Sequence, residues 1–177
     1  MRDRIRKRTK YLTVSAMLCA LGVILLSLGS VIEVLDITAA VFASLLCIYA
    51  VIEMGGAYPW LIWLVTSFLA LLLLPQKTPA LFYALFAGFF PIVKEKLEKL
   101  TPVVAYLLKL AVFHLSLVSI VAGMKLFFPT SLDMGGFWWM PLALYGMCLL
   151  CFVLYDFALT RLITFYLIRL RHRFQIL

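Results

Sequence analysis

The sequence predicts an all-α protein that crosses a membrane several times, and composition and patterning both indicate this. Of its 177 residues 66% are hydrophobic and 14% are charged, and the mean hydropathy is +1.10. Soluble domains contain about half apolar and about a quarter charged residues, so a water-soluble core of this size could not hold so many apolar side chains. The apolar residues also form long runs separated by short polar connections, which is typical of a membrane helix bundle.

Six apolar runs are candidate spans, because a helix needs roughly 20 apolar residues to cross the hydrocarbon layer. They cover residues 11–30, 37–52, 57–74, 80–93, 102–127 and 137–168. The connections leave no room for a soluble domain. We therefore expect a single multi-pass domain, residues 1–177, in the cell (plasma) membrane. The run 80–93 is the shortest, and by length alone it could be a re-entrant segment.

Basic residues predict the orientation of the spans. Residues 1–10, 94–100 and 169–174 carry six, three and three of the 16 Lys and Arg. With six spans these segments all lie on one side, which the positive-inside rule assigns to the cytoplasm. If 80–93 did not cross, the basic C-terminal segment would lie outside. We therefore expect six spans with both termini cytoplasmic, and a fourth helix that continues beyond residue 93 with a kink at Pro91.

The ends of the runs agree with this orientation. The first run is too long for the apolar region of a signal peptide and no small-residue cleavage site follows it, so we expect an uncleaved span. Its basic flank is expected to face anionic lipid rather than nucleic acid. Trp60 and Trp63 are expected near the inner interface, and Trp138 and Trp139 near the outer one.

Motifs for catalysis or for metal binding are missing from the sequence. It contains no HExxH, no GxSxG, no phosphate-binding loop and no Asp-rich lipid-transferase motif. Cys19, Cys47, Cys148 and Cys151 all lie in apolar runs and are expected to act as small apolar residues. The last two form a C-x-x-C without further ligands nearby, so no metal site is expected. We predict no enzymatic activity and no cofactor.

Ionisable residues inside the apolar runs form the first candidate site. Counted from the cytoplasmic ends, Lys109 and Arg161 lie seven residues into their spans, and His114 and Asp156 lie twelve. Antiparallel packing of spans five and six would bring these residues level, and Glu53 is the other acid near the same cations. Such a buried charge cluster could fix helix register, couple a conformational change to a cytoplasmic partner, or relay protons through His114. Arg161 could instead extend to the inner interface.

A second candidate site lies on the outer side. Its residues come from the outer loops and from the helix ends beside them, and they are Glu33, Asp36, Tyr83, Trp138 and Trp139. Together they could form a pocket for a small ligand. Each of them could equally anchor the bundle at the outer interface.

Small residues at four-residue spacing form the third candidate site. Ala16 and Ala20 lie one turn apart on the first run, which also contains Gly22 and Gly29, and further small pairs lie in the second and fourth runs. Such pairs allow helix backbones to approach closely in lipid. They could serve packing within the bundle or contact with a second protein.

The basic N-terminus, the run "SAMLCALGVIL", the acidic first outer loop and the six short-looped spans resemble the substrate-binding S components of energy-coupling factor (ECF) transporters. The resemblance implies that Ala16 and Ala20 contact a membrane T component, which works with two cytosolic ATPases. It also implies uptake of a vitamin-like solute bound from outside. One alternative is a non-catalytic scaffold or assembly subunit of a cell-envelope complex, similar to MreD. Another is a stand-alone carrier or enzyme.

Overall fold

The computed structural model describes residues 2–127 and 139–170. Within these ranges the chain is helical and contains no strand, which confirms the all-α prediction. The chain divides into two units, Met1–Phe127 and Phe128–Leu177. Each unit is described by itself.

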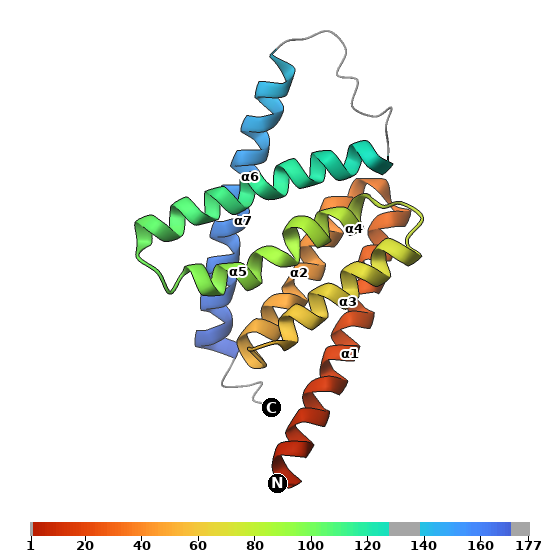
Figure 1. The fold of residues 1–177 in the computed structure, drawn as a ribbon, viewed down its shortest axis with the longest axis vertical. Helices are drawn as coiled ribbons and strands as arrows, with labels where there is room; N and C mark the ends of the chain where they lie inside the picture. The colour runs from red at the N-terminus through yellow and green to blue at the C-terminus, as the bar shows by residue number, and fades with distance from the viewer. Residues whose placement is uncertain (1, 128–138, 171–177) are drawn as a thin grey trace. The chain divides into compact units, whose positions relative to one another are not determined.

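Three apolar helices pack side by side at the start of the first unit (Figure 1). They are α1 (Arg2–Val31), α2 (Asp36–Glu53) and α3 (Tyr58–Leu73), and the 3-10 turn η1 (Glu33–Leu35) precedes α2. Between α2 and α3, Gly55 and Gly56 have φ angles of +59° and +61°. Glycine adopts this left-handed conformation without steric cost, so the pair allows the tight reversal between the two helices.

The fourth apolar run forms helical segments interrupted by a π turn. The segments are α4 (Thr78–Phe82), the π turn η2 (Tyr83–Ala87) and α5 (Phe89–Leu97). The Gly88 N–H donates to the Tyr83 carbonyl at 2.8 Å, five residues back instead of four. In a regular helix the ring of Pro91 would crowd the carbonyl four residues earlier, that of Ala87. The irregularity expected at Pro91 therefore lies one turn before the proline.

The remaining described elements are two long helices and a terminal turn. In the first unit, α6 (Pro102–Phe127) packs along α4, η2 and α5 (Figure 1). In the second unit, α7 (Met140–Phe165) continues into the π turn η3 (Tyr166–Leu170).

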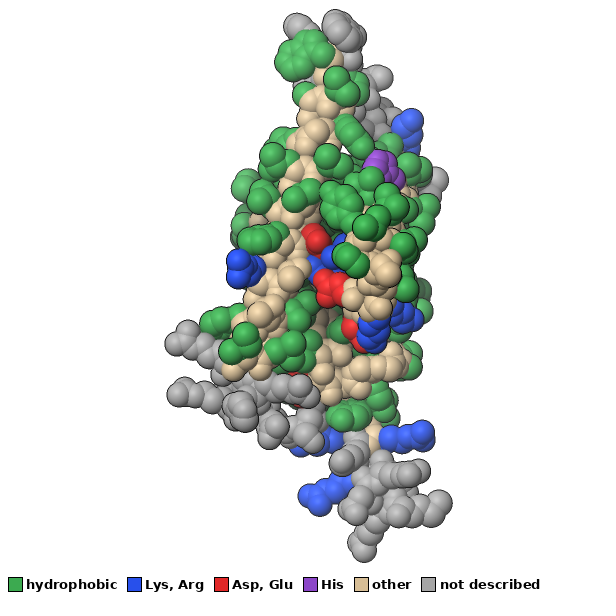
Figure 2. Space-filling model, turned by 90° about the vertical axis from the view of Figure 1, so that its left-hand side faces the viewer, with side chains coloured by type: hydrophobic (Ala, Val, Ile, Leu, Met, Phe, Trp, Pro, Cys, Tyr) green, Lys and Arg blue, Asp and Glu red, His purple; other side chains and the backbone are tan. Residues whose placement is uncertain are grey.

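In the part of the chain that the structure describes, four helical stretches are long and apolar enough to cross a membrane. They are Arg8–Val31, Asp36–Glu53, Pro102–Lys125 and Pro141–Ile168, and the shorter α3 is apolar as well. Apolar side chains cover most of the face shown in Figure 2, and a protein in water rarely exposes so large an apolar surface. These features support a membrane protein. The count of six spans and the cytoplasmic termini stay predictions.

The core of the first unit contains many small residues, which bring α1 and α2 close together. Ala39, Ala40, Ala43 and Cys47 of α2 are all buried. A Cβ added at Gly29 of α1 would lie 2.6 Å from the Cβ of Ala39. This approach is shorter than any real contact between two Cβ atoms, so glycine is required at position 29 for the observed helix spacing.

A glycine-to-alanine pair tests this spacing. Gly29→Ala should lower the free energy of unfolding by about 1–3 kcal/mol, because the added methyl group overpacks the α1–α2 contact. Gly146→Ala on α7 is the matched control, since a Cβ there meets no described atom within 4 Å. Alanine also favours a helix by up to about 1 kcal/mol over glycine. Thermal melting of both variants in the same detergent measures the difference, and equal shifts would contradict the close contact.

Candidate functional site

Helix α1 has a packing face and a separate exposed face. Its packing face consists of buried residues whose spacing alternates between four and three: Ser15, Cys19, Gly22, Leu26 and Gly29. Ala16 and Ala20 are exposed. The two glycines of the first run therefore pack inside the unit, whereas the two alanines face outward.

Larger apolar residues surround the exposed alanines. Leu12 and Ile24, one turn before and one turn after the pair, are 59% and 55% exposed, and the adjacent Met17 is 67% exposed. The surface of α1 is therefore recessed at the two alanines, because the neighbouring side chains are longer. In a membrane, such a recess allows the backbone of another helix to approach closely. We call Ala16 and Ala20 with these neighbours the alanine face.

Tyr83, expected beside an outer ligand pocket, lies in the core of the first unit. Its side chain is 1% exposed, and its hydroxyl oxygen lies 3.2 Å from the Cys47 Sγ on α2. The π turn determines this position, because it carries Tyr83 at its first residue. The sequence showed Tyr83 near the end of an apolar run but contained no signal for a π turn.

The π turn also receives a hydrogen bond from α3. The Gly88 N–H, which would bond to the Ala84 carbonyl in a regular helix, bonds to Tyr83 instead. The indole Nε1–H of Trp63 donates to the Ala84 carbonyl at 3.0 Å. A Cβ at Gly88 would lie 2.8 Å from both the Trp63 and the Tyr83 ring. Trp63, expected only as an interface anchor, therefore stabilises the irregular turn.

In the first unit, Lys109 of the expected charge cluster lies with Lys94 and Glu98, two residues that were not expected there. Lys94 on α5 is fully buried, and its Nζ lies 3.5 Å from the Glu98 Oε1. The Lys109 Nζ on α6 lies 3.4 Å from the same oxygen. One carboxylate is thus within ion-pair distance of two ammonium groups. Burial of an unpaired charge is costly, and this shared contact reduces the cost for Lys94.

Glu98 and Lys94 were missed in the sequence, although a signal for the pair was present. They stand four residues apart in "KEKLEKL", the spacing at which opposite charges meet on a helix. That spacing predicts a pair but does not predict burial. Here the packing of α5 against α2 and α6 buries Lys94.

The other members of the expected cluster lie on several helices. Glu53 is the last residue of α2, and the His114 Nδ1 on α6 lies 2.8 Å from the Leu110 carbonyl oxygen. On α7 the Asp156 carbonyl accepts a hydrogen bond from Thr160. The Arg161 guanidinium lies 5.3 Å from the Phe157 ring centroid. Pairing of Asp156 and Arg161 with Lys109 and His114 stays a prediction.

The expected outer residues also lie on separate elements. Glu33 begins η1, and Asp36 begins α2, where a negative charge interacts favourably with the helix dipole. Trp139 precedes α7 and is exposed, and Trp138 lies outside the described residues. No group of three or more His, Cys, Asp or Glu able to hold a metal occurs among residues 2–127 and 139–170.

Hydrogen bonds connect the C-terminal end of α1 to the turn between α3 and α4. The Ser30 hydroxyl accepts a hydrogen bond from the Gln76 N–H at 3.0 Å and donates to the Gln76 carbonyl at 3.3 Å. The Lys77 ammonium donates to the Leu71 carbonyl at 2.9 Å, near the end of α3. Leu26 and Leu74 are buried beneath these bonds. This end of the first unit, expected to face outside, is packed.

No protein-family model, curated protein or solved structure matches the chain.

An isosteric substitution tests the contact between the π turn and α2. Tyr83→Phe should lower the free energy of unfolding by about 0.5–1.5 kcal/mol, because the ring still packs but its hydroxyl no longer meets Cys47. Tyr106→Phe on α6 is the control, since Tyr106 is 62% exposed. Unfolding in denaturant measures both. A Tyr83→Phe protein as stable as the control would contradict the assigned contact.

Proposed function

We propose that this protein is a non-catalytic membrane subunit that docks onto a second membrane protein through the alanine face of α1. The observation that supports the proposal is the exposure of Ala16 and Ala20, while α1 uses a different set of small residues to pack against α2 and α3. A helix needs small residues where another backbone comes close. In the first unit, Gly22 and Gly29 are the small residues at which α1 comes close to its neighbours. The alanine pair is therefore available to a partner.

The proposed partner is a T component of an ECF-type transporter, and this protein would be its S-component-like subunit. In this arrangement the protein binds a small, vitamin-like solute from outside, and cytosolic ATPases on the T component drive uptake. Exposure of the two alanines that the resemblance assigns to T-component contact agrees with this function. The proposal assigns ATP hydrolysis to the partners and not to this chain.

A scaffold subunit of a cell-envelope complex is the second candidate. The packed outer end of the first unit favours it, because Ser30 and Gln76 hold α1 against the α3–α4 turn. A solute-binding protein needs an outer opening, and a scaffold does not. Both candidates use the alanine face for docking, so they differ in the identity of the partner and in the presence of a solute.

Bulky substitutions test docking through the alanine face. Ala16→Trp and Ala20→Trp should each reduce co-purification of the membrane partner by at least about tenfold, since an indole would hold the partner helix away. Both side chains are exposed, so the isolated protein should melt at an unchanged temperature. Ala111→Trp is the matched control, because Ala111 is an exposed helical alanine on α6. Loss of folding in the two α1 variants would instead show that the face is internal.

The identity of the partner separates the two candidates. We would purify the tagged protein from its native membrane in mild detergent and identify the associated proteins and small molecules by mass spectrometry. A T component, two ATPases and a bound solute are the result expected for uptake. Cell-wall or shape proteins without a solute would contradict uptake and support the scaffold.

A further inference from the structure

The helices of the first unit are level with one another at one end. There the rings of Tyr11 on α1 and Tyr58 on α3 meet edge to face, with their centroids 5.3 Å apart. The Ser15 hydroxyl on α1 donates to the Sδ of Met54, just after α2, at 3.6 Å. We call this the tyrosine end, after Tyr11 and Tyr58. The apolar part of α1 and helix α3 therefore begin, and α2 ends, at one level.

The opposite end of the unit is level in the same way. Ser30, near the end of α1, forms two hydrogen bonds with Gln76, which follows α3. Gly29 meets Ala39 near the start of α2. We call this the serine end, after Ser30. Helices α1, α2 and α3, which lie side by side (Figure 1), thus all extend from one end of the unit to the other.

The distance between the two ends is short for a membrane protein. Helix α3 contains 16 residues and α2 contains 18, which correspond to about 24 and 27 Å at about 1.5 Å per residue. Helix α2 has a carboxylate at each end, Asp36 and Glu53. The hydrocarbon layer of a typical bilayer is about 30 Å thick. Tilting reduces the thickness that a helix covers, so it allows the longer α1 to fit and does not extend α2 or α3.

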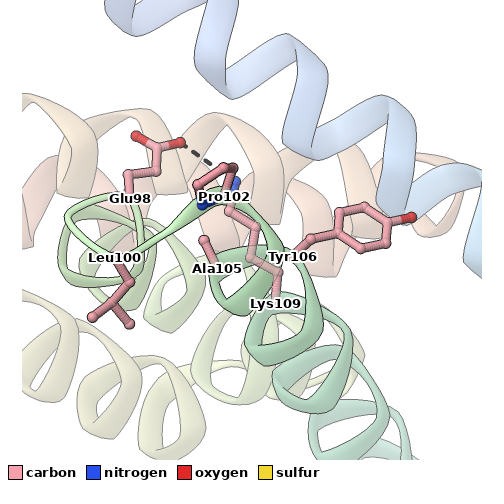
Figure 3. A pocket seen from close by; sticks show the side chains of 6 residues that line it. All are labelled: Glu98, Leu100, Pro102, Ala105, Tyr106 and Lys109. Carbon is pink, nitrogen blue, oxygen red and sulfur yellow. Dashed lines mark hydrogen bonds and ion pairs between the residues drawn. The ribbon is translucent and has the colours of Figure 1, made fainter.

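Aromatic and charged side chains mark both ends of the unit. At the tyrosine end the Lys96 Nζ on α5 lies 5.3 Å from the Trp60 ring centroid, and such amphipathic side chains are typical of the membrane–water interface. Glu98 and Lys109 form a charged contact just beyond, at the α5–α6 turn (Figure 3). At the serine end, Lys77 precedes α4. Polar groups therefore bound the apolar layer of the unit on both sides.

Lys77 and Lys96 are both held by contacts within the unit. Flanking lysines can fit a short helix to a thicker bilayer, because their side chains extend outward to the interface. The Lys77 ammonium instead donates to the Leu71 carbonyl at 2.9 Å, back along α3. The Lys96 ammonium lies over the Trp60 ring. These contacts oppose an adjustment of the unit to thicker lipid.

We infer that the first unit fits a bilayer whose hydrocarbon layer is about 24–27 Å thick, thinner than the typical layer of about 30 Å. Its partner in this contact is a membrane of short acyl chains. The fourth apolar run crosses the same layer, because it leads from Lys77 at the serine end to Lys96 at the tyrosine end. In thicker lipid the unit would thin the bilayer around it at a cost in stability. The inference does not rest on docking through the alanine face.

Bilayers of graded thickness test this inference. The full-length protein is reconstituted into phosphatidylcholine vesicles whose monounsaturated chains lengthen in steps, and X-ray scattering measures the hydrocarbon thickness of each preparation. The melting temperature, followed by tryptophan fluorescence, should be highest at a thickness of about 24–27 Å and lower at about 30 Å. A maximum outside the expected range, or the same melting temperature in every bilayer, would overturn the inference.

Two matched leucine substitutions test whether the helix ends determine this optimum. Leu73, the last residue of α3, is 62% exposed, and Leu100, beyond α5, is 49% exposed. Leu73→Asp moves the polar boundary inward, so the optimum should shift to thinner bilayers by up to about 5 Å, the rise of one helical turn. Leu100→Asp should leave the optimum unchanged, because Leu100 lies outside the apolar layer. An unshifted optimum for Leu73→Asp, or equal shifts in both variants, would contradict the assigned boundary even if both proteins melt earlier.

Discussion

The close approach of α1 to α2 is the contact on which the first unit depends. In lipid the hydrophobic effect does not drive helices together, so van der Waals contact between backbones must contribute instead. Gly29 meets Ala39 with no space for a Cβ, and the buried alanines of α2 continue this contact toward Cys47. Because α2 also packs against α3, α4 and α5, its distance from α1 determines where the other helices of the unit lie.

The π turn η2 connects the fourth apolar run to α2 and α3. Pro91 interferes with regular bonding one turn earlier, and the freed Ala84 carbonyl accepts the Trp63 indole. The same turn directs the Tyr83 hydroxyl to Cys47, so η2 makes polar contacts with both α2 and α3. Polar groups buried in a membrane protein need such partners, since neither lipid nor water satisfies them there.

Much of the helical pattern could be predicted from hydropathy, and the contacts could not. Runs of apolar residues located α2, α3, α6 and α7 to within a few residues, because length and composition decide that property. Helix α1 begins at Arg2, nine residues before the first apolar run, because its basic flank is helical as well. The fourth run forms α4, the π turn η2 and α5 instead of one regular helix. Hydropathy does not predict a π turn, because the turn depends on local hydrogen bonding. Among the candidate site residues, the spacing of Ala16 and Ala20 placed them on one helix face, and both are exposed. Glu98 was missed because the charges of "KEKLEKL" suggested a solvated helix end, whereas tertiary packing buries Lys94.

The two faces of α1 differ in their contacts within the first unit. Residues at alternating spacings of four and three form the packing face, and the alanines lie beside it on the same helix. Small residues at four-residue spacing allow another helix backbone to approach closely, whereas contact with lipid places no such demand on side-chain size. Under the docking proposal, this is why alanine stands at both exposed positions of α1.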